Sequence, residues 1–348
     1  MGASGYIGQH FARRLARHPA FADPLLLAGD RSVGRRLDDV WALDVPVPPE
    51  LADRRFVART PRQLQAARVN LAFGALPSGH AGPLESELLQ RGIAVFTNAA
   101  DHRRDAGVPL LVPEVNADHL RVLGGRDSRR PPLVANPNCT ATGLVLALAP
   151  VWDLLAPAAV HVTTYQARSG AGIPGLGAAE LSANVIPHIA GEEEKVAVET
   201  AVLLGKRRGR RVVPSAVPIL VHAARVPTRD GHLEAVTVVA RRAPSESSLR
   251  RAWTEFDPLA RLPLPTAPHP PIQLATEDDR PQPALDVWAG TPASARGMAA
   301  VVGRIRWSAP HLRFFVLTHN AVRGGAGGSV LNAELALAAG DLRPRGTG

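Results

Sequence analysis

The chain has 348 residues, enough for two domains with separate cores, and 45% of them are hydrophobic. A formal net charge of +9 could indicate nucleic-acid binding. However, the arginines that carry most of this charge are scattered, and aromatic residues, which stack on bases, make up only 4% of the chain. We therefore do not expect a nucleic-acid partner.

Two further features of the composition bear on the compartment. The single cysteine, Cys139, excludes an intramolecular disulfide, which fits a reducing cytoplasm. The longest apolar tract follows this cysteine and is interrupted by Pro150, Asp153 and Pro157. It therefore predicts a buried helix, and we expect no membrane span.

The first part of the chain has the pattern of a dinucleotide-binding fold. Residues 2–8 read Gly-Ala-Ser-Gly-Tyr-Ile-Gly, in which the glycines allow a tight turn and a close approach of the backbone to a pyrophosphate. A helix over 9–16 and short apolar strands at 24–28, 69–73 and 93–96 follow. This alternation predicts a Rossmann-type, doubly wound parallel sheet over residues 1–138.

The glycine loop lacks the strand that should precede it. A turn of this kind follows a strand of the sheet, whereas here Met1 stands directly before Gly2. We expect the first strand to be missing, and we hypothesise that the start codon is mis-assigned and several upstream residues are lost. An intact mass of the native protein that matches residues 1–348 would contradict this hypothesis.

Cys139 lies between a turn signal, Asn136-Pro137-Asn138, and an apolar helical stretch over 143–148. The partial positive charge at a helix N-terminus favours a thiolate, so this cysteine is a candidate nucleophile. The alternative is a small buried core residue. A second unusual residue is Lys195, because arginine is used almost everywhere else. A compact ammonium could be needed there, or the lysine could occur by chance.

The second part of the chain predicts an α+β domain over residues 139–329 with a mainly antiparallel sheet. We expect strands over 212–226 and 233–241, joined by a hairpin turn at Asp230-Gly231. The proline-rich stretch 263–283 predicts an ordered surface excursion. Residues 330–348 contain an apolar helix, 331–337, which we expect to return to the first domain.

A series of segments along nearly the whole chain resembles the archaeal and fungal-type branch of the aspartate-semialdehyde dehydrogenase family. They are residues 2–8, 135–140, 165–172, 191–195, 225–234, 279–283 and 302–306, and they occur in the same order as in that family. The resemblance implies NADPH-dependent reductive dephosphorylation of L-aspartyl 4-phosphate to L-aspartate 4-semialdehyde through a cysteine thioester. This reaction belongs to threonine, methionine and lysine biosynthesis.

The resemblance also implies roles for individual residues. Cys139 matches the nucleophile, His232 the proton shuttle and Gln166 a residue that orients the acyl group. A histidine suits the shuttle because its usual pKa lies near working pH. The residues that match the substrate-binding positions are Arg225 for the carboxylate, Arg103 and Lys195 for the phosphate, Glu192 for the amine, and Asn138 as a neighbour of the cysteine.

The cofactor end of the sequence contains two opposing signals. Asp30 ends the second strand, where an acidic residue would hold ribose hydroxyls and favour NAD. The arginines that follow would instead accept a 2′-phosphate, and the family pattern favours NADP. The resemblance implies NADP contacts, no metal, and a homodimer or homotetramer. The implied contact residues are Gly2, Ser4, Gly5, Tyr6, Ile7, Arg31, Ser32, Arg35, Pro77, Ser78, Ser169, Gly170 and Asn320.

Three alternatives stay open at this point. Two are other acyl-reducing relatives, N-acetyl-gamma-glutamyl-phosphate reductase and malonyl-CoA reductase. The third is a non-catalytic paralogue, and the missing first strand is the main support for this interpretation. The turn before Cys139 and the pair Arg225 and His232 favour the aspartyl enzyme.

Overall fold

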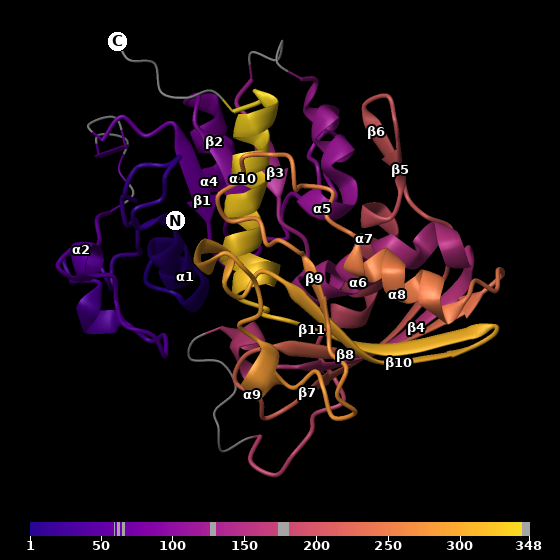
Figure 1. Ribbon diagram of the computed structural model, residues 1–348. Coiled ribbons are helices and arrows are strands. Elements are labelled where there is room, and N and C mark those ends of the chain that lie inside the picture. Colours follow the sequence, from indigo (N-terminus) through magenta and orange to yellow (C-terminus); the bar gives the residue numbers. More distant parts are fainter. Residues whose placement is uncertain (59, 61–62, 65–66, 126–129, 173–180, 343–348) are drawn as a thin grey trace.

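The computed structural model describes residues 1–348 except 59, 61–62, 65–66, 126–129, 173–180 and 343–348. Its two main sheets confirm the predicted fold class. A three-stranded parallel sheet has the order β1-β2-β3, and a six-stranded mixed sheet has the order β7-β4-β8-β11-β10-β9. The two sheets lie in different parts of the molecule, with the C-terminal helix beside the smaller one (Figure 1). No described helix is long and apolar enough to cross a membrane.

The smaller sheet consists of β1 (Leu71–Gly74), β2 (Ala94–Thr97) and β3 (Leu133–Ala135). Its strands are buried on both faces, which explains why they read as short apolar runs without alternation. The elements around it are α1 (Tyr6–Leu15), η1 (Asp38–Val40), α2 (Pro49–Ala52), α4 (Gly82–Gln90), α5 (Pro113–Asn116) and η2 (Ala117–Leu123).

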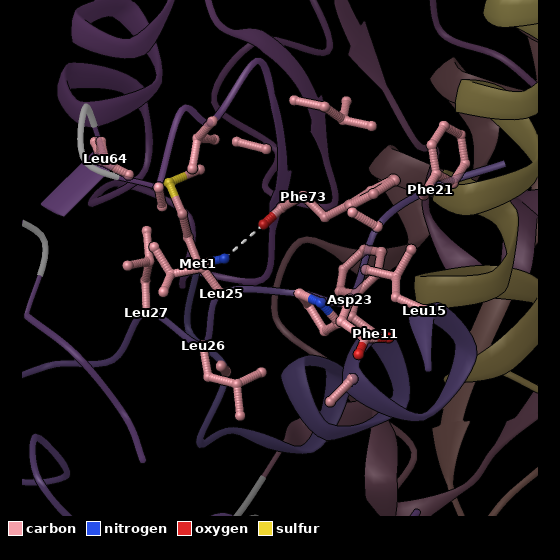
Figure 2. Close-up of a pocket in the computed structure, with 18 of the residues that line it drawn as sticks. Met1, Phe11, Leu15, Phe21, Asp23, Leu25, Leu26, Leu27, Leu64 and Phe73 are labelled. Atoms are coloured by element: carbon pink, nitrogen blue, oxygen red, sulfur yellow. Dashed lines mark hydrogen bonds between the residues drawn. The ribbon is translucent and has the colours of Figure 1, made fainter. Parts of the chain in front are cut away.

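The predicted strand over 24–28 forms only one isolated parallel bridge, between Leu27 and Val57. In the described part of the chain, no strand lies between this segment and β1. Instead, the ammonium of Met1 donates to the carbonyl of Phe73 at 2.7 Å, and the amide of Ala3 donates to the carbonyl of Leu27 at 3.0 Å. The first three residues therefore contact both β1 and the segment 24–28, and Figure 2 draws the bond from Met1 to Phe73.

The larger sheet is built from β4 (Pro157–Gln166), β7 (Ile219–Arg225), β8 (His232–Ala240), β9 (Ile272–Leu274), β10 (Ala300–Ser308) and β11 (His311–Thr318). A core cluster joins its strands to α6 (Cys139–Leu155), α7 (Glu192–Leu203) and α8 (Glu246–Thr254), which lie over one face (Figure 1). Trp253 of α8 is fully buried there, and its indole N–H donates to the carbonyl of Ala147 at 2.8 Å.

The predicted hairpin at Asp230-Gly231 is wrong. β4 lies between β7 and β8, pairing with β7 in parallel and with β8 antiparallel. The connection over 226–231 passes the end of β4, where the amide of Arg168 donates to the carbonyl of Thr228. A two-residue turn joins only adjacent strands, so this longer loop is what allows β4 to insert. The predicted strand over 212–226 is also divided, because β5 (Lys206–Arg208) and β6 (Arg211–Val213) form a separate hairpin.

The proline-rich stretch is ordered, as expected, but it is not confined to the surface. β9 lies within it, and Leu264, Ala267 and Ile272 are buried. Apolar side chains spaced between the prolines explain the difference. The remaining short elements are η3 (Arg168–Ala171), α9 (Pro283–Asp286), η4 (Ala293–Ala295) and η5 (Val322–Ala326).

The last helix, α10 (Gly327–Ala339), is apolar and buried along most of its length. Its Val330, Leu331 and Leu335 pack in one cluster with Phe11 of α1 and Phe73 of β1. This cluster also includes Leu264 and Ala267, so α10 contacts both the smaller sheet and the proline-rich stretch. Figure 1 shows α10 running alongside the smaller sheet.

Candidate active site

Cys139 and His232 are brought together by the ends of two elements. Cys139 is the first residue of α6, and His232 is the first residue of β8. The Sγ of Cys139 lies 3.2 Å from the Nε2 of His232. The turn before the helix is fixed by Asn138, whose side-chain oxygen accepts from the amides of Thr140 and Ala141 and so caps α6. The predicted nucleophile and proton shuttle are therefore in hydrogen-bond contact.

The backbone holds the ring of His232 in one tautomer. The amide of Ala167 donates to Nδ1 at 3.1 Å, so the neutral ring carries its proton on Nε2, toward Cys139. The pKa of His232 is lowered to about 3, chiefly by burial and then by the positive charge of Arg225. The imidazole is therefore neutral at working pH and presents an N–H donor to the sulfur.

The Cys139 thiol is not in the form that its helix position predicts. Part of the side chain stays accessible, yet the pKa of Cys139 is raised to about 12, chiefly by burial and then by the carboxylate of Glu192. Arg103, Arg225 and the Thr140 amide lower the pKa, but they do not outweigh these effects. In this structure the neutral thiol is favoured, which corrects the expectation of a resting thiolate.

Glu192 connects two other predicted residues, Asn138 and Gln166. Its Oε1 accepts from the Nδ2 of Asn138 and from the Nε2 of Gln166, each at 2.9 Å. The hydroxyl of Thr140 lies 3.4 Å from the same oxygen. Glu192 is the first residue of α7 and is buried. Lys195, three residues further along this helix, is half-buried beside Gly191.

Two arginines flank the cysteine, as the effect of their charges on its pKa shows. Arg225, the last residue of β7, is buried, and its Nη1 donates to the carbonyl of Ala167 at 2.7 Å. Arg103 lies in the loop after β2 and donates to the carbonyl of Asn98 at 2.7 Å. Two guanidinium groups beside one thiol form a site suited to a substrate with two anionic ends.

The glycine loop fits a dinucleotide. Gly2 has a φ of +70°, and a Cβ there would lie 2.5 Å from the carbonyl oxygen of Ala75, so only glycine is accommodated without strain. Gly5 caps α1 without any side-chain hydrogen bond, which leaves the first-turn amides near Tyr6 and Ile7 to meet a pyrophosphate. Ser4, within the loop, is half-buried.

The residues predicted to lie on the nicotinamide side are next to Cys139 and His232. Asn320 accepts from the amide of Gly231, which precedes His232, at 2.9 Å, and donates to the hydroxyl of Ser169 at 2.8 Å. Gly170 follows Ser169 and is exposed. The hydroxyl of Tyr6 donates to Asp230 at 2.7 Å, so the glycine loop is joined to the same region.

The other predicted cofactor residues lie in two loops. Asp30, Arg31 and Arg35 are exposed, and Ser32 half-buried, in the turn over 29–35, in which the Ser32 amide donates to the Gly29 carbonyl. Pro77 and Ser78 are exposed in the loop after β1. Among the described residues, no group of three or more potential metal ligands is found.

The family matches divide the chain into the same two parts as the two main sheets. Residues 1–123 match the semialdehyde dehydrogenase NAD binding domain, and residues 148–323 match the semialdehyde dehydrogenase dimerisation domain. An aspartate-semialdehyde dehydrogenase of Archaeoglobus fulgidus is 41% identical over 341 residues, which cover 96% of each chain. The chain belongs to the aspartate-semialdehyde dehydrogenase family.

Two other family comparisons bear on cofactor and substrate. The crystal structure of aspartate-semialdehyde dehydrogenase with NADP from Candida albicans aligns with a TM-score of 0.86 and 32% identity, covering 97% of this chain and 98% of that one. A malonyl CoA reductase (NADP) of Metallosphaera sedula is 35% identical over 354 residues, with 99% and 98% coverage. A nicotinamide cofactor and a dimerisation domain are therefore features of this family member.

Sequence reasoning missed Glu199, which holds two parts of the candidate site together. Its Oε1 accepts from the Nη1 of Arg103 at 2.9 Å, and its Oε2 accepts from the amide of Asn138 at 2.6 Å. The sequence does contain a sign of this role: Glu199 lies seven residues after Glu192, and the two residues therefore share one face of α7.

Gly324 was also missed. A Cβ at this position would lie 2.5 Å from the Cβ of Cys139, so the turn before α10 approaches the nucleophile closely. Only a contact between distant segments reveals this requirement, and local sequence carries no sign of it.

Proposed function

We propose that this chain catalyses the NADPH-dependent reductive dephosphorylation of L-aspartyl 4-phosphate to L-aspartate 4-semialdehyde. The observation that carries the proposal is the 3.2 Å contact between Cys139 and His232, flanked by Arg103 and Arg225. A thiol beside a fixed imidazole suits acyl transfer, and the two guanidinium groups suit a phosphate at one end and a carboxylate at the other. Family membership supports the same activity.

In the first step, the sulfur of Cys139 attacks the β-carbonyl carbon, the C–S bond forms, and the C–O bond to phosphate breaks. The Nε2–H of His232 donates to the sulfur and stabilises negative charge on it, which offsets the raised pKa of the thiol. The thiol proton passes to the phosphate as it departs. Arg103 would hold the departing phosphate with Lys195. Arg225 would bind the α-carboxylate, and the Oε2 of Glu192 the amine, because Oε1 accepts from Asn138 and Gln166.

The bound nicotinamide cofactor supplies the hydride that reduces the thioester carbon. The Nε2–H of His232 then donates a hydrogen bond to the oxyanion at that carbon. As the oxyanion re-forms the carbonyl, the C–S bond breaks, the aldehyde is released, and the Cys139 thiolate takes up a proton from water. Gln166, positioned by Glu192, would orient the acyl group during both steps. Residues of the glycine loop, with Ser169, Gly170 and Asn320, would hold the cofactor beside the catalytic pair.

We infer that NADP is preferred over NAD. Arg31 and Arg35 are exposed in the turn after residues 24–28, where they could reach a 2′-phosphate, with Ser32 between them. The Candida albicans relative was crystallised with NADP. A ratio of kcat/KM that favours NAD, measured with both cofactors, would overturn this inference.

We also infer a homodimer or homotetramer in the cytoplasm. The dimerisation domain supports self-association. Strand β8 alternates buried and half-buried residues, and Leu220 on β7 is 49% exposed, so one face of the larger sheet keeps accessible apolar surface. Light scattering after size exclusion tests this, and a monomer at micromolar concentration would contradict it.

The activity is tested in reverse with aspartate semialdehyde, inorganic phosphate and NADP, by following NADPH absorbance. We expect turnover that Cys139→Ala abolishes, with His161→Gln, an exposed histidine on β4, as the matched control. A second candidate is reduction of malonyl-CoA, which the Metallosphaera sedula relative supports. Replacing phosphate and aspartate semialdehyde with coenzyme A and malonate semialdehyde decides between the two.

A further inference from the structure

The hairpin of β5 and β6 concentrates positive charge outside the candidate active site. Residues 206–211 read Lys-Arg-Arg-Gly-Arg-Arg, without an acidic residue among them. The hairpin follows the end of α7, and Figure 1 shows it projecting from the rest of the molecule. Its charge is therefore balanced either by contacts with distant parts of the fold or by a partner.

Two of these arginines have partners in the fold. The Nε of Arg207 lies 3.4 Å from a carboxylate oxygen of Asp118, and the Nη2 of Arg210 donates to the carbonyl of Leu123 at 3.4 Å. Both partners belong to η2, in the first part of the chain. These two contacts fasten the hairpin to η2 and account for two of its five cations.

The other three cations share one face of the hairpin. Lys206 lies opposite Val213 in the antiparallel pairing. Arg208 lies opposite Arg211 in the same ladder. Directly paired residues, and residues two apart along a strand, point to the same face, so these four side chains are neighbours, and all four residues are exposed.

The charge on this face is not compensated within the protein. Lys206, Arg208 and Arg211 make no side-chain hydrogen bond or ion pair with the part of the chain that the structure describes. Like charges directly opposite each other in a ladder destabilise the pairing, as do Arg208 and Arg211 here. We call Lys206, Arg208 and Arg211 the cationic face. A bound anionic group would relieve its repulsion.

A cavity of about 200 Å³ adjoins the cationic face. Its lining combines Lys206, Arg208 and Val213 of the hairpin with Trp152, in the last turn of α6, and Leu204, just after α7. Val213 is 53% exposed although it is apolar. Pockets for whole small-molecule ligands usually measure roughly 300–1,000 Å³, so this cavity has the size for a single apolar side chain.

We propose that the cationic face and this cavity form a docking site for an acidic peptide segment of another protein, with one apolar side chain in the cavity and carboxylates on either side of it. Arg211 lies outside the lining, so a ligand that meets all three cations must extend beyond the cavity, as a peptide does. Guanidinium groups bind carboxylates in bidentate pairs, and an apolar anchor in a pocket is typical of the centre of an interface.

A nucleic acid would also be attracted to the cationic face, but the surroundings favour a peptide. Single strands bind strongly where several aromatic rings stack on successive bases. Among the described residues of the cavity lining, Trp152 is the one aromatic residue, and it is half-buried. The cavity therefore accepts one apolar group and offers no series of stacking surfaces.

The first test measures the binding of a fluorescein-labelled peptide, Glu-Asp-Glu-Phe-Glu-Asp-Glu, to the intact protein by anisotropy at about 50 mM salt. We expect the triple variant Lys206→Gln, Arg208→Gln and Arg211→Gln to weaken binding at least about ten-fold. The matched control replaces three exposed arginines on other segments, Arg91, Arg251 and Arg261, with glutamine and so has the same net charge. Equal losses in the two triple variants, or no binding to the native chain at about 1 mM peptide, would overturn the proposal.

The second test examines the anchor and the location of the site with the native chain. A peptide with alanine in place of phenylalanine should bind about ten-fold more weakly, and the phenylalanine peptide should slow hydrogen exchange over residues 206–213. Equal affinities of the two peptides, or protection only in other segments, would refute the site. Tighter binding of a thymidine heptanucleotide than of the peptide, lost in the same triple variant, would show that the cationic face binds nucleic acid instead.

Discussion

At the residue scale, Glu199 links the turn before Cys139 to Arg103, the proposed phosphate-binding arginine, through one carboxylate. Replacing it with glutamine keeps the shape but removes the charge that holds Arg103. Charged hydrogen bonds contribute about 1.5–3 kcal/mol, so we expect Glu199→Gln to lower kcat/KM for phosphate about 10- to 100-fold in the reverse reaction. The effect should fall mainly on the KM for phosphate. The substitution removes the carboxylate that positions Arg103, and Arg103 is the proposed phosphate-binding group.

The matched control for this prediction is Glu194→Gln, on the same helix. Glu194 pairs with Arg104, but its side chain is 69% exposed. Exposed ion pairs contribute little, so its kinetics should not change. Equal losses in the two variants would show that Glu199 has no specific positioning role.

A second prediction concerns Glu234, which is fully buried on β8 and has neither carboxylate oxygen hydrogen-bonded. Burial, and then the charge of Glu192, raise the pKa of Glu234 well above its usual value. The folded state therefore holds this proton at pH values where the unfolded chain releases it. Its contribution to the free energy of unfolding is full below about pH 4.5 and decreases as pH rises toward the folded-state pKa.

Glu234→Gln removes this dependence. The stability of the variant relative to the native chain should therefore be greater at pH 8 than at pH 5, measured by urea unfolding at both values. The control is Glu87→Gln, an exposed residue whose relative stability should not vary. A relative stability of Glu234→Gln that decreases with pH would contradict the raised pKa.

Most catalytic positions at this scale were predictable, because Cys139, His232 and Gln166 each lie in a short, distinctive motif. The structure places these three close together, although their roles remain proposals. The protonation state of Cys139 was not predictable, since it depends on burial and on Glu192, 53 residues away in the chain. Local sequence shows the helix N-terminus but not what covers it.

At the element scale, α1 is joined to the loop after β11 by two buried histidines. The rings of His10 and His319 lie 5.6 Å apart, and His319 also packs against Trp288. The pKa of each is lowered to about 3, in both cases first by burial. Both rings are therefore neutral in the folded protein.

This arrangement predicts acid lability. Below about pH 6.5 these two histidines bind protons in the unfolded chain but stay neutral in the folded chain. The free energy of unfolding therefore falls as pH decreases toward 3. Each histidine contributes up to about 1.4 kcal/mol per pH unit in this window. Urea unfolding at pH 7, 6 and 5 measures the slope, which His10→Asn should reduce and the exposed His161→Gln should not. Equal slopes for all three proteins would contradict the prediction.

The strands themselves were easier to predict than their order in the sheet. Apolar patterning located β7 and β8, but their order depends on β4, which begins 62 residues before β7 and 75 residues before β8. A turn signal such as Asp230-Gly231 reports local backbone geometry and carries no information about a strand that inserts from elsewhere. The hairpin prediction failed for this reason.

At the scale of the whole molecule, α10 connects segments that are distant in the sequence. Leu331 is fully buried in a cluster with Phe11, Phe73 and Phe96, and the same cluster includes Leu264 and Met298. Trp288 packs against this cluster, whereas Trp253 lies in the core of the larger sheet. The two tryptophans are therefore natural reporters of the two cores.

We expect Leu331→Ala to lower the free energy of unfolding by about 2–5 kcal/mol, because it removes a buried side chain and leaves a cavity. Its control is Leu285→Ala, since Leu285 is 61% exposed and should change stability by less than about 0.5 kcal/mol. Urea unfolding is followed by fluorescence in two Leu331→Ala proteins that each retain one tryptophan, Trp288 or Trp253, with the other four of the five tryptophans replaced by phenylalanine. Because Leu331 lies only in the cluster around α10, the transition that retains Trp288 should move to lower urea than the one that retains Trp253. Coincident transitions would mean instead that the two cores unfold as one cooperative unit even when α10 is weakened.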